Sequence, residues 1–331
     1  MSKLITIAVD AMGGDNSPYK IIDGIEYHHK TSPNIYYRLF GNEKIISPYI
    51  NKKSISKNSY EIIHTDEIIK GEDSAFAAAK RGKNTSMWLA VESVKKNSSD
   101  IVVSAGNTGA LLVLAKLNIK MIENIDKPAL SGLWPNKIGM NVVLDLGANI
   151  ECSEKNLIDF SLMGSALYSA LFENQKPKVA LLNIGSEELK GNSIIKNTFQ
   201  ELSKNNNFLF DFFGYIEGNH IMDGKVNVIV TDGFTGNVAL KTAEGTANFI
   251  TSELRNALTN NFIGKISSFL NMKNLKNFKK KLDPRSYNGA ILLGLRSPVV
   301  KSHGGTDYIG FANSLSVCEK IVKNSLIDKI K

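Results

Sequence analysis

One six-residue turn has the composition of an anion-binding loop. The turn Ser104-Ala-Gly-Asn-Thr-Gly109 follows the β-branched run Ile101–Val103 and precedes the helix-forming stretch Ala110–Leu117. A strand, a glycine turn and a helix in this order direct backbone N–H groups and a helix N-terminus at one point, which favours phosphate. The glycines permit close approach of the backbone, and the polar side chains can donate hydrogen bonds. The candidate phosphate ligands are Ser104, Gly106, Asn107, Thr108 and Gly109. The turn matches neither GxGxxG nor GxxxxGK[ST], so a glycine turn without a ligand remains an equal alternative here.

Four other apolar runs end in a similar way. They are Leu4–Val9 before Asp10-Ala-Met-Gly-Gly-Asp15, Val142–Leu144 before Asp145-Leu-Gly-Ala-Asn149, Val179–Leu182 before Asn183, and Val226–Val230 before Thr231-Asp-Gly. Strands that alternate with helices form a mostly parallel sheet, and ligands bind beyond the carboxyl ends of its strands. We therefore expect the polar residues after these strands to share one cleft. Capping of the next helix is the alternative role of each Asp or Asn.

Further elements support this sheet. Strands are predicted at Ile35–Phe40, Tyr60–His64, Ala290–Gly294 and Val299–Lys301, and helices at Pro18–Lys30, Thr85–Lys96, Gly236–Leu258 and Tyr308–Ile327. Beyond Leu258 the apolar residues before and after Asn271 lie on different faces of a helix, which predicts two helical segments with a joint near Asn271. No linker divides the chain, so we expect one α/β/α domain over residues 1–331, with a helical hairpin inserted at about 251–283.

Lysines on this hairpin oppose an apolar stripe. They are Lys273, Lys276, Lys280 and Lys281. Such a stripe packs on the protein's own core, on a dimer partner, or against an anionic membrane, and all three remain open.

Composition narrows the class of protein. The 331 residues are 43% hydrophobic and 22% charged, as in globular proteins. The net charge of +8 is compatible with an acidic protein, an anionic membrane or a phosphorylated substrate, and it does not single out nucleic acid. Cys152 and Cys318 form no disulfide framework and no metal-ligand pattern, which indicates buried thiols in a reducing compartment. No apolar run is long enough for a signal peptide or a membrane span, so we expect a cytoplasmic or peripheral protein without a metal.

Taken together, the loops resemble the bacterial phosphate acyltransferase family, the acyl-ACP:phosphate transacylases of phospholipid synthesis (ACP, acyl carrier protein). The matching motifs are Asp10-Ala-Met-Gly-Gly-Asp15, Ser104-Ala-Gly-Asn-Thr-Gly-Ala110, Leu144-Asp-Leu-Gly-Ala-Asn149, Leu181-Leu-Asn-Ile-Gly185 with Lys190-Gly-Asn192, Glu217-Gly218, and Asp232-Gly-Phe-Thr-Gly-Asn237 with Leu240-Lys-Thr242. The sequence departs from the family pattern at Tyr215, Asn219-His220, Asn288, Ile291 and Gly305-Thr306. The resemblance implies a Rossmann-like α/β/α fold related to phosphotransacetylases and to isocitrate and isopropylmalate dehydrogenases. It also implies a homodimer.

The implied reaction joins inorganic phosphate to the acyl group of acyl-ACP, releasing holo-ACP and an acyl phosphate for a membrane glycerol-3-phosphate acyltransferase. Phosphate is already an anionic nucleophile and a thiolate leaves readily, so no cofactor is needed. On this basis Lys190 balances the phosphate or the oxyanion, Asn183 and Asn237 orient the substrates, and His303 either assists proton transfer or is structural. The residues expected to organise the substrate loops are Asp10, Gly13, Gly14, Asp145, Asn149 and Asp232.

Two other classes of protein explain less of the sequence. A dehydrogenase of the related fold needs a dinucleotide site and usually an acidic metal cluster, and the sequence contains neither. A non-catalytic basic membrane adaptor explains the hairpin lysines but gives no purpose to five glycine loops at strand ends.

Overall fold

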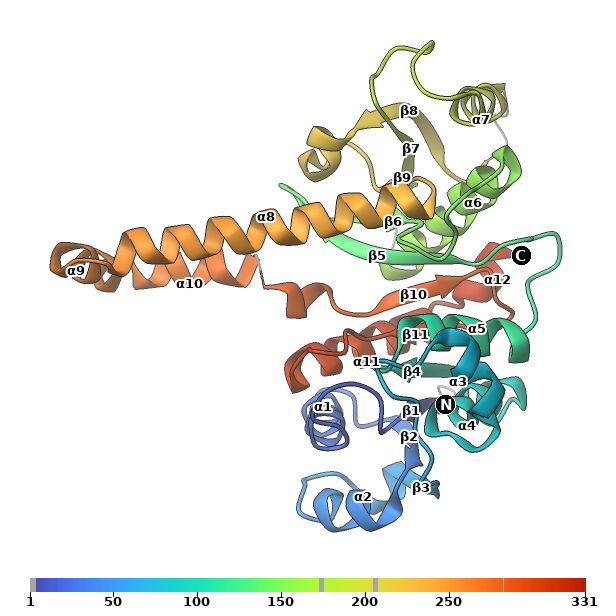
Figure 1. Ribbon diagram of the computed structural model, residues 1–331, viewed down its shortest axis with the longest axis vertical. Coiled ribbons are helices and arrows are strands. Elements are labelled where there is room, and N and C mark those ends of the chain that lie inside the picture. The colour runs from blue at the N-terminus through green and yellow to red at the C-terminus, as the bar shows by residue number, and fades with distance from the viewer. Residues whose placement is uncertain (1–3, 173–175, 205–207, 282) are drawn as a thin grey trace.

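A single large sheet runs through the molecule. The computed structural model describes residues 4–172, 176–204, 208–281 and 283–331. In this part of the chain an 11-stranded sheet has the order β3-β2-β1-β4-β11-β10-β5-β6-β9-β7-β8, with helices on both faces (Figure 1). The strands are β1 (Ile5–Asp10), β2 (Ile35–Gly41), β3 (Tyr60–His64), β4 (Ile101–Ser104), β5 (Ala129–Pro135), β6 (Met140–Leu144), β7 (Lys178–Asn183), β8 (Asp211–Glu217), β9 (Val228–Val230), β10 (Ala290–Leu293) and β11 (Val299–Lys301). The predicted α/β class with a mostly parallel sheet is confirmed.

The direction of the strands reverses in the middle of the sheet. β10 is antiparallel to both β11 and β5, β5 is antiparallel to β6, and the other neighbours are parallel. Consequently β6, β9, β7 and β8 run opposite to β1, β4 and β11. The carboxyl ends of these two sets of strands therefore lie at opposite ends of the sheet along the strand direction. The prediction that all five strand ends share one cleft is wrong.

Helices cover the two faces of the sheet. They are α1 (Tyr19–His29), α2 (Glu43–Ile50), α3 (Ala75–Arg81), α4 (Ser86–Lys95), α5 (Thr108–Asn118), α6 (Glu154–Leu171), α7 (Ser193–Lys204), α8 (Gly233–Thr259), α9 (Phe262–Leu270), α10 (Met272–Lys281), α11 (Tyr308–Lys323) and α12 (Leu326–Ile330). Side chains alternate along β1: Ile7 and Val9 join one core cluster, and Ala8 joins the cluster on the other face. Burial of both faces explains the continuous apolar runs of these strands.

Helix ends follow local side-chain chemistry. Thr85 caps α4, because its hydroxyl accepts from Trp88 N. The closing helix expected at Tyr308–Ile327 is two helices, because Ser325 adopts a left-handed conformation with φ 50° between α11 and α12.

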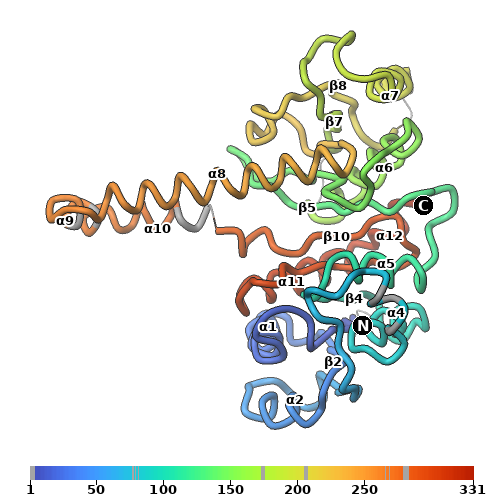
Figure 2. Tube along the Cα trace, viewed as in Figure 1, coloured from blue at the N-terminus to red at the C-terminus, as the bar shows by residue number. Residues whose placement is uncertain are grey.

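The hairpin stands away from the body of the molecule (Figures 1 and 2). Its first helix, α8, begins at Gly233 and runs to Thr259, so it starts earlier than the predicted Gly236. The break predicted near Asn271 is confirmed, because Asn271 is the C-cap of α9 and α10 follows it. No helix of the described residues is long and apolar enough to span a bilayer.

Candidate functional site

Three neighbouring strands end in polar residues that contact one another. Asp10, Ser104 and Lys301 are the last residues of β1, β4 and β11, and Ser104 is in register with both others. Ser104 Oγ donates to Asp10 Oδ2 at 2.6 Å, and Ser86 Oγ donates to Asp10 Oδ1 at 2.7 Å. Gly106 N donates to Ser104 Oγ at 3.0 Å, which ties the predicted phosphate turn to the carboxylate. Burial raises the pKa of Asp10, although these donors oppose that rise.

Two buried lysines accompany this carboxylate, and neither was predicted from the sequence to belong to the site. Lys20 of α1 and Lys301 are each 8% exposed, and their ammonium groups donate to the carbonyls of Gly304 and Ser302 respectively. Burial, and after it the charge of Lys20, lower the pKa of Lys301 to about 8 against the attraction of Asp10. Burial also lowers the pKa of Lys20. We name these two lysines, with Asp10, Ser104 and the loops that touch them, the β1–β4–β11 cluster.

Glycines let three loops of this cluster meet without side chains between them. Gly14 has φ +81°, and a Cβ there would lie 2.7 Å from Ala105 O and 3.0 Å from Gly304 O. A Cβ on Gly13 would lie 2.6 Å from Asp10 Oδ2. Asp15 N donates to Gly304 O at 3.1 Å. The Asp10 loop and the Ser104 turn therefore lie together, as expected, and the His303 loop joins them.

The side chain of Asn107 forms hydrogen bonds only within the protein, among the described residues. Its Oδ1 caps α5 by accepting from Ala110 N at 2.9 Å, and its Nδ2 donates to Gly71 O at 2.8 Å and to Asp73 O at 2.9 Å. These contacts occupy both amide hydrogens, so of the two roles expected for Asn107, donation to a ligand and capping of the helix, its side chain performs the second. The backbone at exposed Thr108 and half-buried Gly109 still opens the helix at this turn.

His303 lies on the exposed loop that follows β11. Its backbone N–H donates to Asn288 Oδ1 at 2.8 Å, and Gly305 N donates to its Nδ1 at 3.2 Å. Partial burial and then the charge of Lys301 lower the pKa of His303, and Glu244 and Lys241 of α8 also act on it. The charges of α8, which follows β9 in the other half of the sheet, therefore act on this loop.

A second cluster surrounds Asp145 at the opposite edge of the sheet. The carboxylate is fully buried and accepts from the backbone N–H groups of Leu130 (3.0 Å), Gly147 (3.2 Å), Ala148 (3.0 Å) and Asn149 (2.8 Å). Asn149 Nδ2 also donates to Asp145 at 2.8 Å and to Pro128 O at 2.7 Å. Asp145 thus organises backbone donors, which belong to its own loop except for Leu130 of β5.

The start of α8 rests on the Asp145 loop. Asp232 caps the helix, accepting from Thr235 N and Thr235 Oγ1, each at 2.8 Å. A Cβ on Gly233 would lie 2.8 Å from Asp145 Oδ2, so only glycine permits this close contact. The exposed Asn237 donates through Nδ2 to Leu146 O at 3.1 Å. Capping, the alternative role named for such residues, therefore holds for Asp232.

Asn183 carries a buried acceptor without a partner. It ends β7 and is 7% exposed, and its Nδ2 donates to Lys190 O at 3.2 Å. Its Oδ1 has no hydrogen-bond partner in the described part of the chain. The Lys190 side chain is exposed beside it. A polar substrate group could satisfy this acceptor.

The two clusters are separated across the sheet. β10 and β5 lie between β11 and β6, so three strand spacings of about 4.8 Å place Asp145 roughly 14 Å to the side of Lys301. β7 is two strands further, at roughly 24 Å. The sheet therefore does not place Lys190 beside the Ser104 turn of the same chain. An anion held at that turn has Lys20 and Lys301 as its nearby cations.

Comparison with known proteins identifies the family. A family model described as "Fatty acid synthesis protein" matches residues 5–329. The chain is 68% identical over 331 residues to the phosphate acyltransferase of Pelagibacter ubique, covering 100% of this chain and 99% of that protein. It is 41% identical over 331 residues to the phosphate acyltransferase of Rhodospirillum rubrum, covering 100% and 95%. The chain belongs to the phosphate acyltransferase family.

Solved structures show how this phosphate acyltransferase shares its fold with other enzymes. A phosphotransacetylase from Streptococcus pyogenes aligns with a TM-score of 0.65 and 16% identity, covering 98% of this chain and 95% of that one. A 4-hydroxythreonine-4-phosphate dehydrogenase from Klebsiella pneumoniae aligns with a TM-score of 0.53 and 12% identity, covering 97% and 100%. At these identities the likeness shows the fold alone, and the expected relation to phosphotransacetylases is confirmed at that level.

The cysteines of this acyltransferase are not activated. Cys152 and Cys318 are buried, and burial raises the pKa of the Cys152 thiol to about 11 and that of Cys318 further. A thiol with a raised pKa is a poor nucleophile at neutral pH. Among the described residues, no group of three or more His, Cys, Asp or Glu side chains could hold a metal ion.

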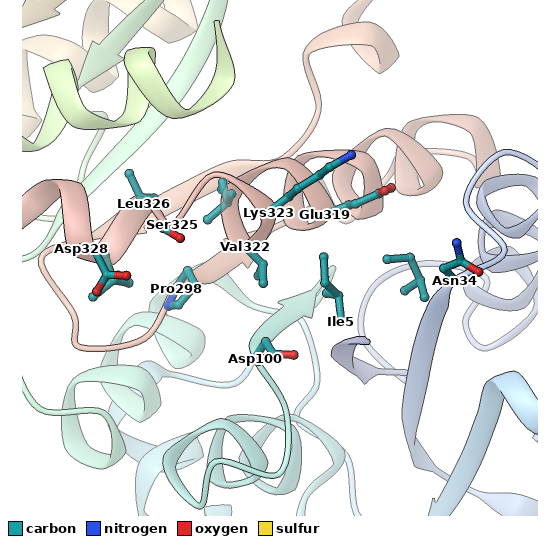
Figure 3. Close-up of a pocket in the computed structure, with 13 residues that line it drawn as sticks. Ile5, Asn34, Asp100, Pro298, Glu319, Val322, Lys323, Ser325, Leu326 and Asp328 are labelled. Atoms are coloured by element: carbon teal, nitrogen blue, oxygen red, sulfur yellow. The ribbon is translucent and has the colours of Figure 1, made fainter. Parts of the chain in front are cut away.

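Two cavities lie near the sheet edges. One of about 570 Å³ is lined by residues that include Ile5, Asp100, Pro298 and Glu319 (Figure 3). Ile5, Asp100 and Pro298 lie at the amino ends of β1, β4 and β11, away from Asp10, Ser104 and Lys301, and Glu319 lies on α11. The other, of about 890 Å³, is lined by residues that include Asp232, Phe234 and Asn192, beside the second cluster. The second cavity is therefore the one that adjoins candidate site residues.

Proposed function

We propose that this phosphate acyltransferase moves the acyl group of acyl-ACP to inorganic phosphate, forming acyl phosphate and holo-ACP. The observation that carries the proposal is the 68% identity to a phosphate acyltransferase over the whole chain. The cation-lined glycine loops at the ends of β1, β4 and β11 support it, because they suit an anionic substrate.

The chemistry needs little from the protein beyond binding and electrostatics. A phosphate oxygen attacks the thioester carbonyl, and the tetrahedral intermediate expels a thiolate, whose conjugate acid has a pKa near 8.5. The enzyme must hold the two substrates together and stabilise the oxyanion. Neither step requires a thiol nucleophile, a metal or another cofactor from the chain.

In this proposal each of the two clusters binds a different substrate. We assign phosphate to the Ser104–Gly109 turn, with Asp10 holding the turn in place through Ser104. Asn183, Lys190 and Asn237 are assigned to the acyl donor, whose carrier-borne arm is flexible and extended. The exposed position of Lys190 and the unpartnered Oδ1 of Asn183 support this assignment. His303 is assigned to proton transfer.

The decisive experiment mixes the protein with acyl-ACP and inorganic phosphate and measures acyl phosphate. Product should accumulate in proportion to enzyme, depend on phosphate, and be absent when phosphate is replaced by chloride at equal ionic strength. Acyl-CoA in place of acyl-ACP tests the need for the carrier. Failure to form acyl phosphate from either donor would exclude the proposed reaction.

We also propose that the hairpin pairs with a second copy of the chain in a cytoplasmic homodimer. Large apolar side chains along α8 and α9 face solvent in the single chain, including Phe249, Ile250, Phe262, Ile263, Phe269 and Leu270. An unpartnered apolar stripe of this length favours a protein partner. Sedimentation should give a dimer, and replacement of Phe249 and Ile250 by serine should weaken it. A monomer at micromolar concentration would exclude this partner.

The hairpin's lysines fit a peripheral contact with an anionic membrane, where a membrane glycerol-3-phosphate acyltransferase would receive the product. Lys273 and Lys276 are exposed on α10, and the side chains of Lys280 and Lys281 lie outside the described residues. Each lysine near an anionic surface contributes about 1 kcal/mol, enough for reversible binding. Replacing the four by glutamate should release the protein from anionic vesicles and preserve turnover in solution. Vesicle binding that survives the replacement would exclude the contact.

A further inference from the structure

Two ammonium groups are buried side by side in the β1–β4–β11 cluster. Lys20 reaches it from α1 and Lys301 from the end of β11, and the charge of Lys20 is close enough to lower the pKa of Lys301. The partners recorded for both groups within the described residues are backbone carbonyls. Burial of two like charges is unfavourable unless an anion compensates them.

The carboxylates nearby do not supply this compensation in full. Both oxygens of Asp10 already accept from serine hydroxyls, Ser86 and Ser104. Asp15 acts on Lys20, but it is exposed, so water screens its charge. Two buried cations therefore face one buried carboxylate, and the cluster has an excess positive charge.

The glycine loops beside these lysines also have unpaired backbone donors within the described part of the chain. The N–H groups of Gly13, Gly14 and Gly304 make no hydrogen bond recorded among the described residues. A Cβ on Gly14 would lie 3.0 Å from Lys20 Nζ, so the absence of a side chain leaves the ammonium group open to this loop. Unpaired N–H groups beside cations form an anion-binding concavity.

We infer that Lys20 and Lys301 together hold the inorganic phosphate that the proposed reaction consumes. Ser104 lies between Asp10 and Lys301 in the sheet, so phosphate bound by the two lysines borders the Ser104–Gly109 turn. Two ammonium groups suit a dianion, and the Gly13–Gly14 and Gly304 N–H groups complete its hydrogen bonds. This assignment rests on the proposed function for the identity of the anion, and it names the cations that the Ser104 turn itself lacks.

The test measures phosphate binding and turnover separately. Titration of the full-length protein with inorganic phosphate, without an acyl donor, gives a dissociation constant, and steady-state assays give the KM for phosphate and for the acyl donor. Lys20→Gln and Lys301→Gln remove one charge each and keep an N–H donor for the carbonyl. Lys30→Gln, at the exposed end of α1, is the matched control.

Each site variant should weaken phosphate binding and raise the phosphate KM at least about tenfold, with the acyl-donor KM little changed, because each loses one charge-assisted contact. Lys30→Gln should match the parent protein. Unchanged phosphate binding in folded Lys20→Gln and Lys301→Gln proteins would overturn the inference. If the parent protein binds phosphate through these lysines but forms no acyl phosphate, the site stands and the proposed function fails. If Lys301→Gln does not fold, Lys20→Gln alone decides.

Discussion

Replacement of Asp145 by asparagine tests whether this carboxylate holds its loop together. Asp145 Oδ2 accepts from Asn149 N and Asn149 Nδ2, and Oδ1 accepts from Leu130, Gly147 and Ala148. An asparagine that keeps its oxygen at the Oδ1 position places an NH₂ group against both Asn149 donors. A hydrogen bond to a charged group contributes about 1.5–3 kcal/mol, so two losses should destabilise the protein by about 3–6 kcal/mol.

Urea unfolding measures this loss directly, because the free energy of unfolding extrapolates linearly to water. Asp211→Asn is the matched control: Asp211 is exposed, and its ion pair with Lys176 lies at the surface. The control should change stability by no more than about 1 kcal/mol. A loss below about 1 kcal/mol in Asp145→Asn, with the control unchanged, would refute the reasoning. In that case the five contacts would not support the loop on which α8 begins.

Other outcomes follow from the same contacts. Lys190→Ala should reduce turnover at least about tenfold in a folded protein, as for loss of one preorganised contact, and normal steady-state kinetics would remove it from the site. Asn107→Ala should lower the free energy of unfolding by about 1 kcal/mol or more through loss of the α5 cap, measured in urea. The phosphate KM should rise as pH passes above about 8, because Lys301 is cationic only below its pKa of about 8, and Lys301→Gln should lack this rise. The double Cys152→Ala, Cys318→Ala variant should keep most activity in chelator; complete loss in a folded protein would mean that a thiol takes part.

The sequence predicted a strand most directly where burial is complete on both faces. Runs such as Ile101–Ser104 are apolar and β-branched because no position faces water. It missed β5, whose residues Ala129–Pro135 include Ser131, Gly132 and Pro135 and therefore lack such a run. That omission concealed the reversal of strand direction, since β5 and β10 carry the antiparallel pairs.

The site was predictable where chemistry is local to one loop. The contact between the Asp10 loop and the Ser104 turn follows from glycine content and from two adjacent parallel strands. Lys20 had no signal of its own, because a lysine on an amphipathic helix is normally solvated, and its burial depends on the distant Gly304 loop. Lys301 had a weak sequence signal, because it is a charged residue at the end of an apolar strand and before a polar turn. Capping also competed with binding, and it determined the contacts of Asn107 and Asp232.

Charge and burial together indicate which edge of the sheet receives the anion. Both clusters have glycine loops and backbone donors, so loop composition does not distinguish them. At the Asp145 edge, Lys190 is exposed, and water and salt screen its charge. At the Asp10 edge, Lys20 and Lys301 are buried, where the same charges interact more strongly with a ligand. A dianion therefore gains more at the β1–β4–β11 cluster, and the thioester carbonyl of the acyl donor must reach that cluster for the proposed attack.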